Sequence, residues 1–158
     1  MTPVGEDVTT CAVREQLDAT RSVALDMLFS NAAHSTLMLS PLTTADVRAQ
    51  MESLLSTNGH GVSTIADSAG LVAQRVVAMI VNIACDIAQQ RIAATLDIDL
   101  AVTLGLGYPH GPLAWGDLLG PRIVERVLLN MHALSGDPRY RVSPWLRRRA
   151  ALRVSLRA

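Results

Sequence analysis

The sequence is poor in aromatic residues and has no lysine. Its 158 residues include one Phe, two Trp and two Tyr, and all fourteen basic residues are arginine. Apolar residues nevertheless make up 49% of the chain, so Leu, Val, Ile, Ala and Met must fill the core. Strands favour aromatic and β-branched residues, whereas helices pack well with this set. The composition therefore predicts a mainly α fold of one domain, or one domain with part of another.

The chain also lacks an excess of charge of either sign. Fourteen acidic residues balance the arginines, and this excludes a global electrostatic pull toward nucleic acid or an anionic membrane. A local exception is the basic tail, which consists of Arg147, Arg148, Arg149, Arg153 and Arg157. We interpret the tail as a solvated final helix. The alternative is that its arginines bind phosphate groups.

Cysteine and long apolar runs are scarce as well. Cys11 and Cys85 do not make a disulfide framework in a chain of this length. Residues 1–10 are polar and carry no apolar segment of a signal peptide. The most apolar stretch, residues 76–85, is too short to span a bilayer. We therefore expect a cytoplasmic protein without membrane contact.

The first part of the chain reads as a small strand and helix unit. Residues 1–21 have a weak pattern and are expected to form a loose or partly helical leader. Residues 22–29 are compatible with a strand or a helix, and residues 35–42 indicate a strand. Residues 43–56 predict a helix, and residues 62–66 a second strand, which together form a βαβ unit with a parallel strand pair.

The helix expected over residues 43–56 has both a cap and an apolar stripe. Thr43 or Thr44 can accept a hydrogen bond from a backbone N–H of the first turn, where Asp46 also meets the positive helix end. Apolar side chains recur at helical spacing, and we expect them to be buried: Val47, Met51, Leu54 and Leu55.

From Gly70 onward the pattern is helical throughout. The first helix, over residues 70–90, carries an apolar face wide enough to be buried on more than one side. We expect Thr95 to cap the second helix, Gly105 to end it, and Pro112 to begin a third that ends near Leu119. Two more helices are predicted over residues 122–134 and from Ser143-Pro144 onward.

Several short motifs in this helical part resemble a known family. Residues 67–75 (DSAGLVAQR) resemble the D-x-P-G-F-x-x-N-R segment that opens the C-terminal domain of 3-hydroxyacyl-CoA dehydrogenases. Residues 97–99 (DID), followed by residues 105–112 (GLGYPHGP), resemble that domain's D-I-D and G-x-G-x-P-x-G-P signature. Further matches follow in the same order: Asp117, Gly120 and residues 136–140 (GDPRY).

The resemblance implies a helical bundle of this C-terminal domain type over residues 67–158. Residues 22–66 would then be a small βαβ remnant of a degenerate nucleotide-binding domain, preceded by the leader 1–21. The pattern is most similar to the second, repeated C-terminal domain of long bacterial members, including those of phenylacetate breakdown, where Gln often stands in the N-R position as Gln74 does here.

The resemblance also implies an activity that this chain alone does not support. The family oxidises (S)-3-hydroxyacyl-CoA to 3-oxoacyl-CoA with NAD⁺, in fatty-acid or aromatic acyl-CoA breakdown. A histidine base, paired with a glutamate, takes the hydroxyl proton while a hydride passes to nicotinamide. No stretch here matches that His–Glu motif, and no glycine-rich dinucleotide fingerprint follows a first strand. We therefore expect no catalytic residue and no NAD bound by this chain alone.

The candidate substrate-binding residues are Gln74 and Arg75, at the start of the first long helix. Gln74 stands at the family's substrate-holding asparagine and is one methylene longer. The functional interpretation is a polar pair facing the acyl-CoA cleft, since a helix N-terminus suits an anion. The alternative is a solvated helix start at which Arg75 pairs with a carboxylate.

Other polar residues point to structure rather than chemistry. The four histidines, His34, His60, His110 and His132, are not at metal-ligand spacing, so no metal site is expected. Asp117 is expected to accept backbone hydrogen bonds at a helix junction.

Two functional hypotheses follow from the resemblance. In the first, the chain is the dimerisation and substrate-pocket domain of an NAD-dependent dehydrogenase, which pairs with a nucleotide-binding domain and an acyl-CoA substrate. In the second, it is a non-catalytic homodimerisation module. A homodimer is expected in both, because such domains bury wide apolar helix faces against a twin.

Overall fold

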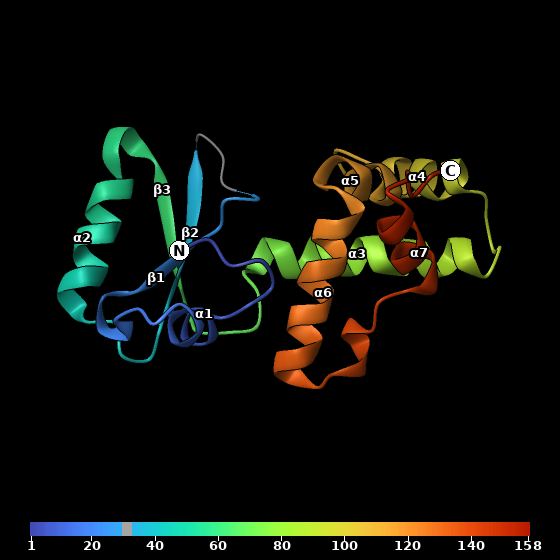
Figure 1. The fold of residues 1–158 in the computed structure, drawn as a ribbon. Coiled ribbons are helices and arrows are strands. Elements are labelled where there is room, and N and C mark those ends of the chain that lie inside the picture. The colour runs from blue at the N-terminus through green and yellow to red at the C-terminus, as the bar shows by residue number, and fades with distance from the viewer. Residues whose placement is uncertain (30–32) are drawn as a thin grey trace. The chain divides into compact units, whose positions relative to one another are not determined.

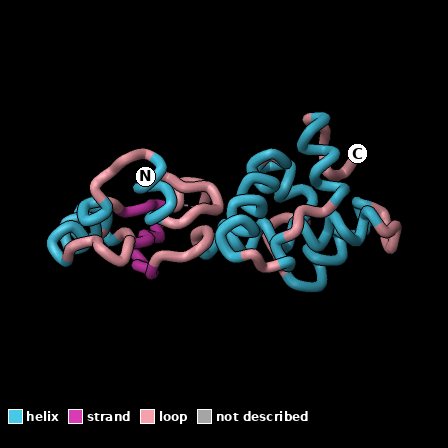
Figure 2. The backbone as a smooth tube through the Cα atoms, turned by 60° about the horizontal axis from the view of Figure 1, so that its bottom comes forward, coloured by secondary structure: helices cyan, strands magenta, loops and turns pink. Residues whose placement is uncertain are grey.

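The computed structural model describes residues 1–29 and 33–158, and the chain divides into two compact units (Figure 1). The first unit spans Met1–Gln74 and the second spans Arg75–Ala158. The first contains all three strands of the described residues, and the second is made of helices (Figure 2).

The sheet of the first unit has the order β1-β2-β3. Strand β1 (Val23–Leu25) runs antiparallel to β2 (His34–Leu39), and β2 runs parallel to β3 (Gly61–Ala66). The register places Leu37 opposite Thr64 in the parallel pair. The predicted strand–helix–strand order and its parallel pair are confirmed, and the ambiguous segment 22–29 contributes a short strand. Residues 30–32, between β1 and β2 in the sequence, lie outside the described residues.

Helix α2 (Ala45–Leu55) connects the two parallel strands. It begins after Thr44, whose side chain accepts a hydrogen bond from the backbone N–H of Val47, so one of the two predicted caps is confirmed. The expected buried stripe is wrong, since no residue of α2, all of which the structure describes, is buried and Leu54 is 65% exposed. The helix packs mainly against β3, and a three-stranded sheet offers little apolar surface to cover it.

The first 21 residues are held within the first unit rather than lying loose. Helix α1 (Val8–Arg14) buries Val8, Cys11 and Ala12, and a short 3₁₀ turn, η1, follows at Ala19–Arg21. The backbone N–H groups of Val8 and Thr9 both donate to the carboxylate of Asp67, at 2.7 and 3.1 Å. This partner lies almost sixty residues away, so the local pattern could not reveal it.

The second unit consists mainly of α-helices, as predicted. Helix α3 (Val72–Gln89) starts in the last residues of the first unit and is followed by α4 (Thr95–Leu106), α5 (Pro112–Leu119), α6 (Pro121–Ser135) and α7 (Pro144–Leu152). Two short 3₁₀ turns complete the described elements: η2 (Thr57–Gly59) in the first unit and η3 (Pro138–Tyr140) in the second.

The helix ends follow simple backbone rules. Pro112 is the first residue of α5, where its missing N–H costs nothing, and the Ser143 side chain caps α7, both as predicted. Two predictions for α4 are wrong. The last residue of the helix is Leu106 rather than Gly105, and a left-handed Gly107 (φ 66°) follows it, while Thr95 is the first helical residue rather than the cap. The Thr95 hydroxyl instead donates to the carbonyl of Arg157 at 3.0 Å.

Helix α3 is long and apolar enough to cross a membrane by length and composition alone. A central helix of a globular unit passes the same test, and 44% of this helix is buried within the structure. Asn82, in the middle of α3, is buried with both polar ends of its amide bonded to the backbone before α7. These features suit a core helix.

Candidate functional site

Gln74 is the last residue of the first unit and is almost fully buried, with 1% of its surface exposed. Its amide nitrogen donates to the carbonyl of Pro3 and to the carboxylate of Asp26, both at 3.1 Å, and its amide oxygen accepts from the N–H of Gly5 at 2.9 Å. The amide thus ties α3 to the N-terminal segment and to the end of β1. A substrate contact by Gln74 stays a prediction, and the structure gives this side chain a supporting role within its unit.

Asp26 completes this polar cluster. It is only 2% exposed, and its Oδ1 also accepts the backbone N–H groups of Leu28 and Phe29 at 3.1 and 3.3 Å. A buried carboxylate needs such donors, because burial without partners is costly. Gln74 supplies one of them.

Arg75 is the first residue of the second unit and is half-buried. Within that unit it has no ion pair among the residues that the structure describes, so the expected carboxylate partner is not found there. Its substrate role stays a prediction.

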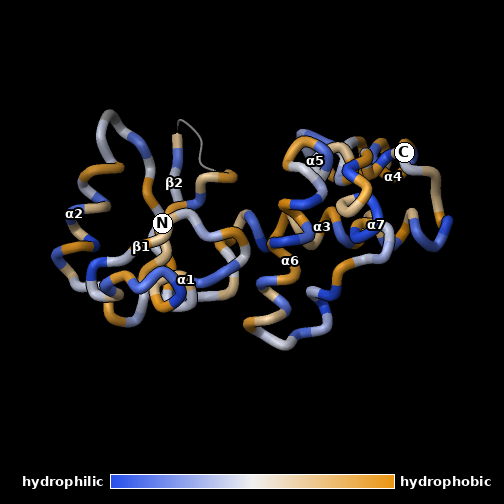
Figure 3. The backbone as a smooth tube through the Cα atoms, in the orientation of Figure 1, coloured by the Kyte–Doolittle hydropathy of each residue, from blue (hydrophilic) through white to orange (hydrophobic). Residues whose placement is uncertain are grey.

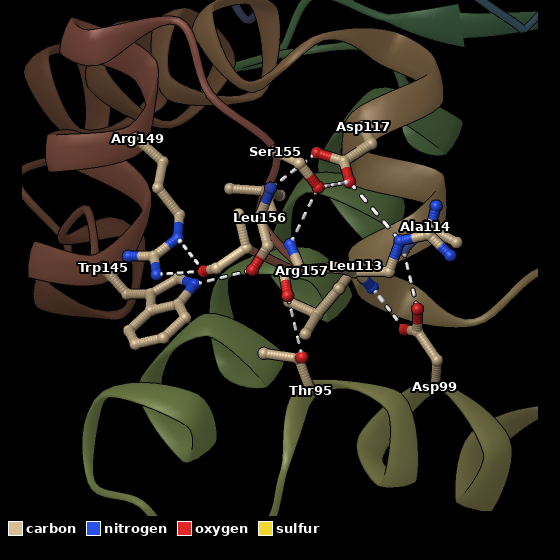
Figure 4. Close-up of polar contacts among 11 residues, drawn as sticks. Thr95, Asp99, Leu113, Ala114, Asp117, Trp145, Arg149, Ser155, Leu156 and Arg157 are labelled. Atoms are coloured by element: carbon tan, nitrogen blue, oxygen red, sulfur yellow. Dashed lines mark hydrogen bonds and ion pairs between the residues drawn. The ribbon is translucent and has the colours of Figure 1, made fainter.

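The D-I-D motif and the glycine-rich loop meet in space. Asp99 of α4 is 9% exposed, and its two carboxylate oxygens accept the N–H groups of Leu113 and Ala114 at 2.7 and 3.0 Å (Figure 4). These N–H groups belong to the first turn of α5, where they have no partner within the helix. Asp99 therefore caps α5 across a gap of fourteen residues, and its negative charge also suits the positive helix end.

Gly111 is required by this cap. A β-carbon at Gly111 would lie 2.3 Å from the β-carbon and 2.6 Å from the Cα of Asp99, closer than real atoms approach. Glycine at this position lets the start of α5 lie directly against α4. The signature loop therefore allows α4 and α5 to pack closely against each other.

The rest of the loop packs against one tryptophan. Tyr108 and His110 each make an edge-to-face contact with Trp115, with ring centroids 6.4 and 6.0 Å apart. Such contacts stabilise a loop by a modest amount beyond area burial. The turn that follows α4 is therefore packed against α5.

Asp117 fixes the chain that follows α7. Its carboxylate accepts the N–H of Leu156 at 2.7 Å and the hydroxyl of Ser155 at 2.5 Å, and it pairs with Arg157 at 3.5 Å (Figure 4). The indole N–H of Trp145 donates to the Leu156 carbonyl at 2.9 Å. These bonds give Asp117 the structural role expected from the sequence.

Leu156 itself is an anchor. It is completely buried and lies against Gly116, where a β-carbon would be 2.5 Å from a Leu156 methyl and 2.7 Å from a methyl of Val81. The bulk of Leu156 and Val81 thus accounts for glycine at this point of α5. Sequence reasoning missed both Gly116 and Leu156, because their partners lie far along the chain.

An apolar groove opens on the second unit between α3, α4 and the start of α5. It encloses about 150 Å³ and is lined entirely by apolar side chains apart from the Tyr108 hydroxyl, among them Ile80, Ile83, Val102 and Leu106. Beyond the groove, α4 presents Leu96, Leu100 and Leu104 at four-residue spacing, each more than half exposed. Figure 3 shows apolar residues recurring along α3 and α4.

Neither cysteine is suited to nucleophilic chemistry. Both side chains are buried, and burial is the main cause that raises the pKa of the Cys11 thiol to about 11 and that of Cys85 to about 12. The hydrogen bond to Glu6 raises the pKa of Cys11 further. Within residues 1–29 and 33–158, no group of three His, Cys, Asp or Glu side chains could hold a metal ion.

The turn between β2 and α2 is where a parallel pair would place a dinucleotide phosphate. It reads Ser40-Pro41-Leu42-Thr43-Thr44, without glycine. The Thr44 side chain already binds an N–H of the first turn of α2, and Thr43 donates to the Ser22 carbonyl. A pyrophosphate needs glycine at such a turn so that the backbone can approach it. This turn therefore does not fit a dinucleotide phosphate.

These features define a helical domain whose polar motif residues cap helices and fix the C-terminal segment, with an apolar groove on one side. The family described as 3-hydroxyacyl-CoA dehydrogenase, C-terminal domain, matches residues 70–155, more than half of the chain. The chain belongs to this family through that domain.

Individual relatives support the same conclusion. The chain is 46% identical over 98 residues to the 3-hydroxyadipyl-CoA dehydrogenase of Escherichia coli K12, a match that covers 62% of this chain and 21% of the relative. It is 34% identical over 82 residues to a 3-hydroxybutyryl-CoA dehydrogenase of Clostridioides difficile, covering 52% of this chain and 29% of the relative.

A crystal structure of 3-hydroxybutyryl-CoA dehydrogenase from Escherichia coli K12 superposes with a TM-score of 0.83 and 34% identity. The superposition covers 96% of this chain and 31% of that chain, so it includes the first unit as well as the second. The chain thus spans between a fifth and a third of the length of these relatives.

Proposed function

We propose that this chain provides the dimerisation and substrate-pocket part of an NAD-dependent 3-hydroxyacyl-CoA dehydrogenase and acts together with a nucleotide-binding domain. The observation that carries the proposal is the family match over residues 70–155 together with the capped α4–α5 corner built by the family's motif residues. The proposed reaction is the oxidation of 3-hydroxyacyl-CoA to 3-oxoacyl-CoA. The proposed location is the cytoplasm.

The substrate class follows from the relatives' names. They are dehydrogenases of 3-hydroxyadipyl-CoA and 3-hydroxybutyryl-CoA, which share a 3-hydroxyacyl group joined to coenzyme A. The apolar groove between α3 and α4 suits an acyl or methylene chain, because its lining is apolar save for one hydroxyl. We assign the chain to the repeated C-terminal domain of long bacterial members, since the Escherichia coli relatives are about three to five times its aligned length.

The need for a nucleotide-binding domain follows from the turn at Ser40–Thr44. Because that turn does not fit a dinucleotide, the hydride acceptor must be held by another polypeptide or another part of the protein. The residues of this chain then bind and orient the acyl group, exclude water from it and hold the helices that shape the cleft.

Homodimerisation is proposed from exposed apolar side chains. Leu96, Leu100 and Leu104 of α4 and Val76 and Ile83 of α3 are all at least half exposed. Several exposed apolar side chains on two helices of one unit favour an interaction site. Sedimentation velocity of Leu100→Glu against Leu129→Glu, a control on the exposed side of α6, tests the idea. Dissociation of only the Leu100 variant supports it, and an unmodified chain that sediments as a monomer at high concentration contradicts it.

NADH oxidation with acetoacetyl-CoA tests the proposed function. The rate is measured with the purified chain alone, with a separately expressed nucleotide-binding domain of the family alone, and with the two mixed. We expect turnover well above the sum of the separate rates only in the mixture. Gly111→Ala, which disturbs the α4–α5 corner, should abolish this increase in the rate of NADH oxidation, whereas Gly105→Ala should retain it.

The second candidate is a non-catalytic homodimerisation module. The burial of the Gln74 amide favours it, because that amide is already used by Pro3, Gly5 and Asp26. A mixture that shows no gain in NADH oxidation, combined with a stable dimer in sedimentation, selects this function over the first.

A further inference from the structure

A second hollow in the second unit is lined by charged side chains. It is open to solvent and has a volume of about 560 Å³ between the α5–α6 turn and the end of α7. Three arginines line it, Arg122, Arg153 and Arg157, together with the carboxylate of Asp117 and the hydroxyl of Ser155. The hollow is separate from the apolar groove, with which it shares no lining residue.

The charges in this hollow do not balance. Asp117 is the one carboxylate among the lining residues, and it is already engaged by Ser155, the Leu156 N–H and Arg157. Neither Arg122 nor Arg153 forms an ion pair with any residue in the described part of the chain. Two guanidinium groups are thus left to meet an anion from outside.

Arg153 occupies a backbone position that normally favours glycine. It ends α7 with φ 59°, in the left-handed region. The same position at the ends of α4 and α6 is taken by Gly107 (φ 66°) and Gly136 (φ 65°). Other residues also take this region, Gln16 after α1 (φ 55°) and Arg91 after α3 (φ 55°), so the backbone tolerates arginine here. Arginine at this point places a long cationic side chain at the hollow.

The backbone adds a donor at the α5–α6 turn, which also lines the hollow. Helix α6 begins after Gly120, without a side-chain cap, and its first residue is Pro121, which has no N–H. The N–H groups of Ile123 and Val124 donate to the Gly120 carbonyl, whereas that of Arg122 has no partner among the described residues. The positive end of a fifteen-residue helix therefore faces the same region as the guanidinium groups.

We propose that this hollow binds the phosphate group of a small phosphorylated ligand. Guanidinium forks match phosphate oxygens and form charge-assisted pairs with them. Apolar atoms of Pro121 and Val154 line the remaining space, and the hollow exceeds the volume of a phosphate ion, so an organic group attached to the phosphate has room. The inference does not depend on dehydrogenase activity.

Amide chemical shifts of the full chain test this site. Inorganic pyrophosphate and adenosine 3′,5′-bisphosphate are titrated separately at constant ionic strength, because salt screens surface charge. We expect saturable shifts of the Gly120, Arg122 and Ser155 amides with at least one of the two probes. Tighter binding of the bisphosphate identifies a nucleotide-like ligand, and tighter binding of pyrophosphate identifies the phosphate groups as the whole ligand.

Arg153→Gly is the decisive variant because glycine suits the backbone at this position and the fold should be retained. It should weaken binding about tenfold or more, the usual effect of losing a charged hydrogen bond. The matched control is Arg148→Ala, an exposed arginine of α7 that does not line the hollow. Chemical shifts that do not saturate, or an equal loss of affinity in Arg153→Gly and Arg148→Ala, would overturn the proposal.

Discussion

In the first unit, hydrogen bonds between segments that are distant in sequence hold the chain around a small sheet. In the second unit, buried side chains cap the ends of the packed helices. In the first, a compact apolar cluster of Val8, Ala24, Met38 and Leu71 is flanked by the carboxylate of Asp67 and the amide of Gln74. In the second, Asp99, Asn82 and Asp117 bind backbone groups at helix ends and in the C-terminal segment.

This difference shows where the family's motif residues are used. Residues 97–99 and 105–112 serve one corner of the second unit, so their spacing is fixed by helix packing. Asp67 and Gln74 serve the first unit, where Asp67 holds α1 and Gln74 holds the N-terminal segment. One continuous motif set therefore stabilises two separate architectures, and substitutions should affect one unit at a time.

The largest effect is expected at the α4–α5 corner. In Gly111→Ala the new methyl group meets Asp99 at its backbone, which cannot move without disturbing α4, so we expect about 3 kcal/mol of destabilisation. Gly105→Ala is the matched control, because nothing lies within 4 Å of its β-carbon and alanine favours a helix interior, by about 0.5–1 kcal/mol. Urea unfolding of both variants checks the pair. A Gly111→Ala chain as stable as the wild type would refute the close packing.

Gln74→Ala should damage the first unit. It removes one of the donors to Asp26 and the side-chain partner of the Gly5 N–H and the Pro3 carbonyl, which costs about 2 kcal/mol. Gln50→Ala, at an exposed position of α2, should be close to neutral. Hydrogen exchange measured by residue is the readout, since protection should fall in α1 and the sheet while α5 and α6 keep theirs. Uniform loss across both units would show that they are not separable.

A smaller effect is expected at the C-terminal segment. Asp117→Asn keeps the shape but replaces one acceptor oxygen by a donor and removes the charge that meets Arg157, so we expect a loss of about 1–2 kcal/mol. The Leu156 amide should exchange faster with solvent in this variant, and the Trp145 indole signal should shift. Unchanged exchange at Leu156 would mean that the segment is held by Leu156 packing alone.

The smallest effect is expected in the alkylation of the two thiols. Because one lies in each unit, their reactivity compares how well the two units bury a side chain. Cys11 in the first unit and Cys85 in the second are both buried, with the pKa of each thiol raised well above the usual value. The reactive thiolate is therefore scarce at pH 8, and the folded chain should resist iodoacetamide until denaturant is added. If one unit opens more readily, its cysteine will be alkylated first, so mass spectrometry ranks the local stabilities.

Much of this fold could be predicted from the sequence because its helices carry local signals. Pro112 and Ser143 mark helix starts, and the strands around residues 35–42 and 62–66 follow from short apolar runs bounded by turn residues. The cap by Asp99, the anchoring of Leu156 and the burial of Gln74 could not be predicted from local patterns, because each depends on a partner between 14 and about 70 residues away. The prediction of a buried stripe on α2 is wrong for a related reason. The helical period identifies the apolar face of a helix, but it does not show how much surface of the protein packs on that face.

The candidate site was predicted only in outline. Gln74 and Arg75 were selected through the family motif, and the structure places Gln74 in a buried network that the motif alone does not describe. The arginines of the second hollow belong partly to the basic tail, but Arg122 lies outside it. Their convergence depends on the α5–α6 turn, which no charge pattern indicates.

The most direct test of this account is the rate of NADH oxidation with acetoacetyl-CoA by the chain alone and by the chain mixed with a nucleotide-binding domain of the family. We expect turnover in the mixture and none by the chain alone, because the β2–α2 turn does not fit a dinucleotide. Turnover by the purified chain alone would contradict it.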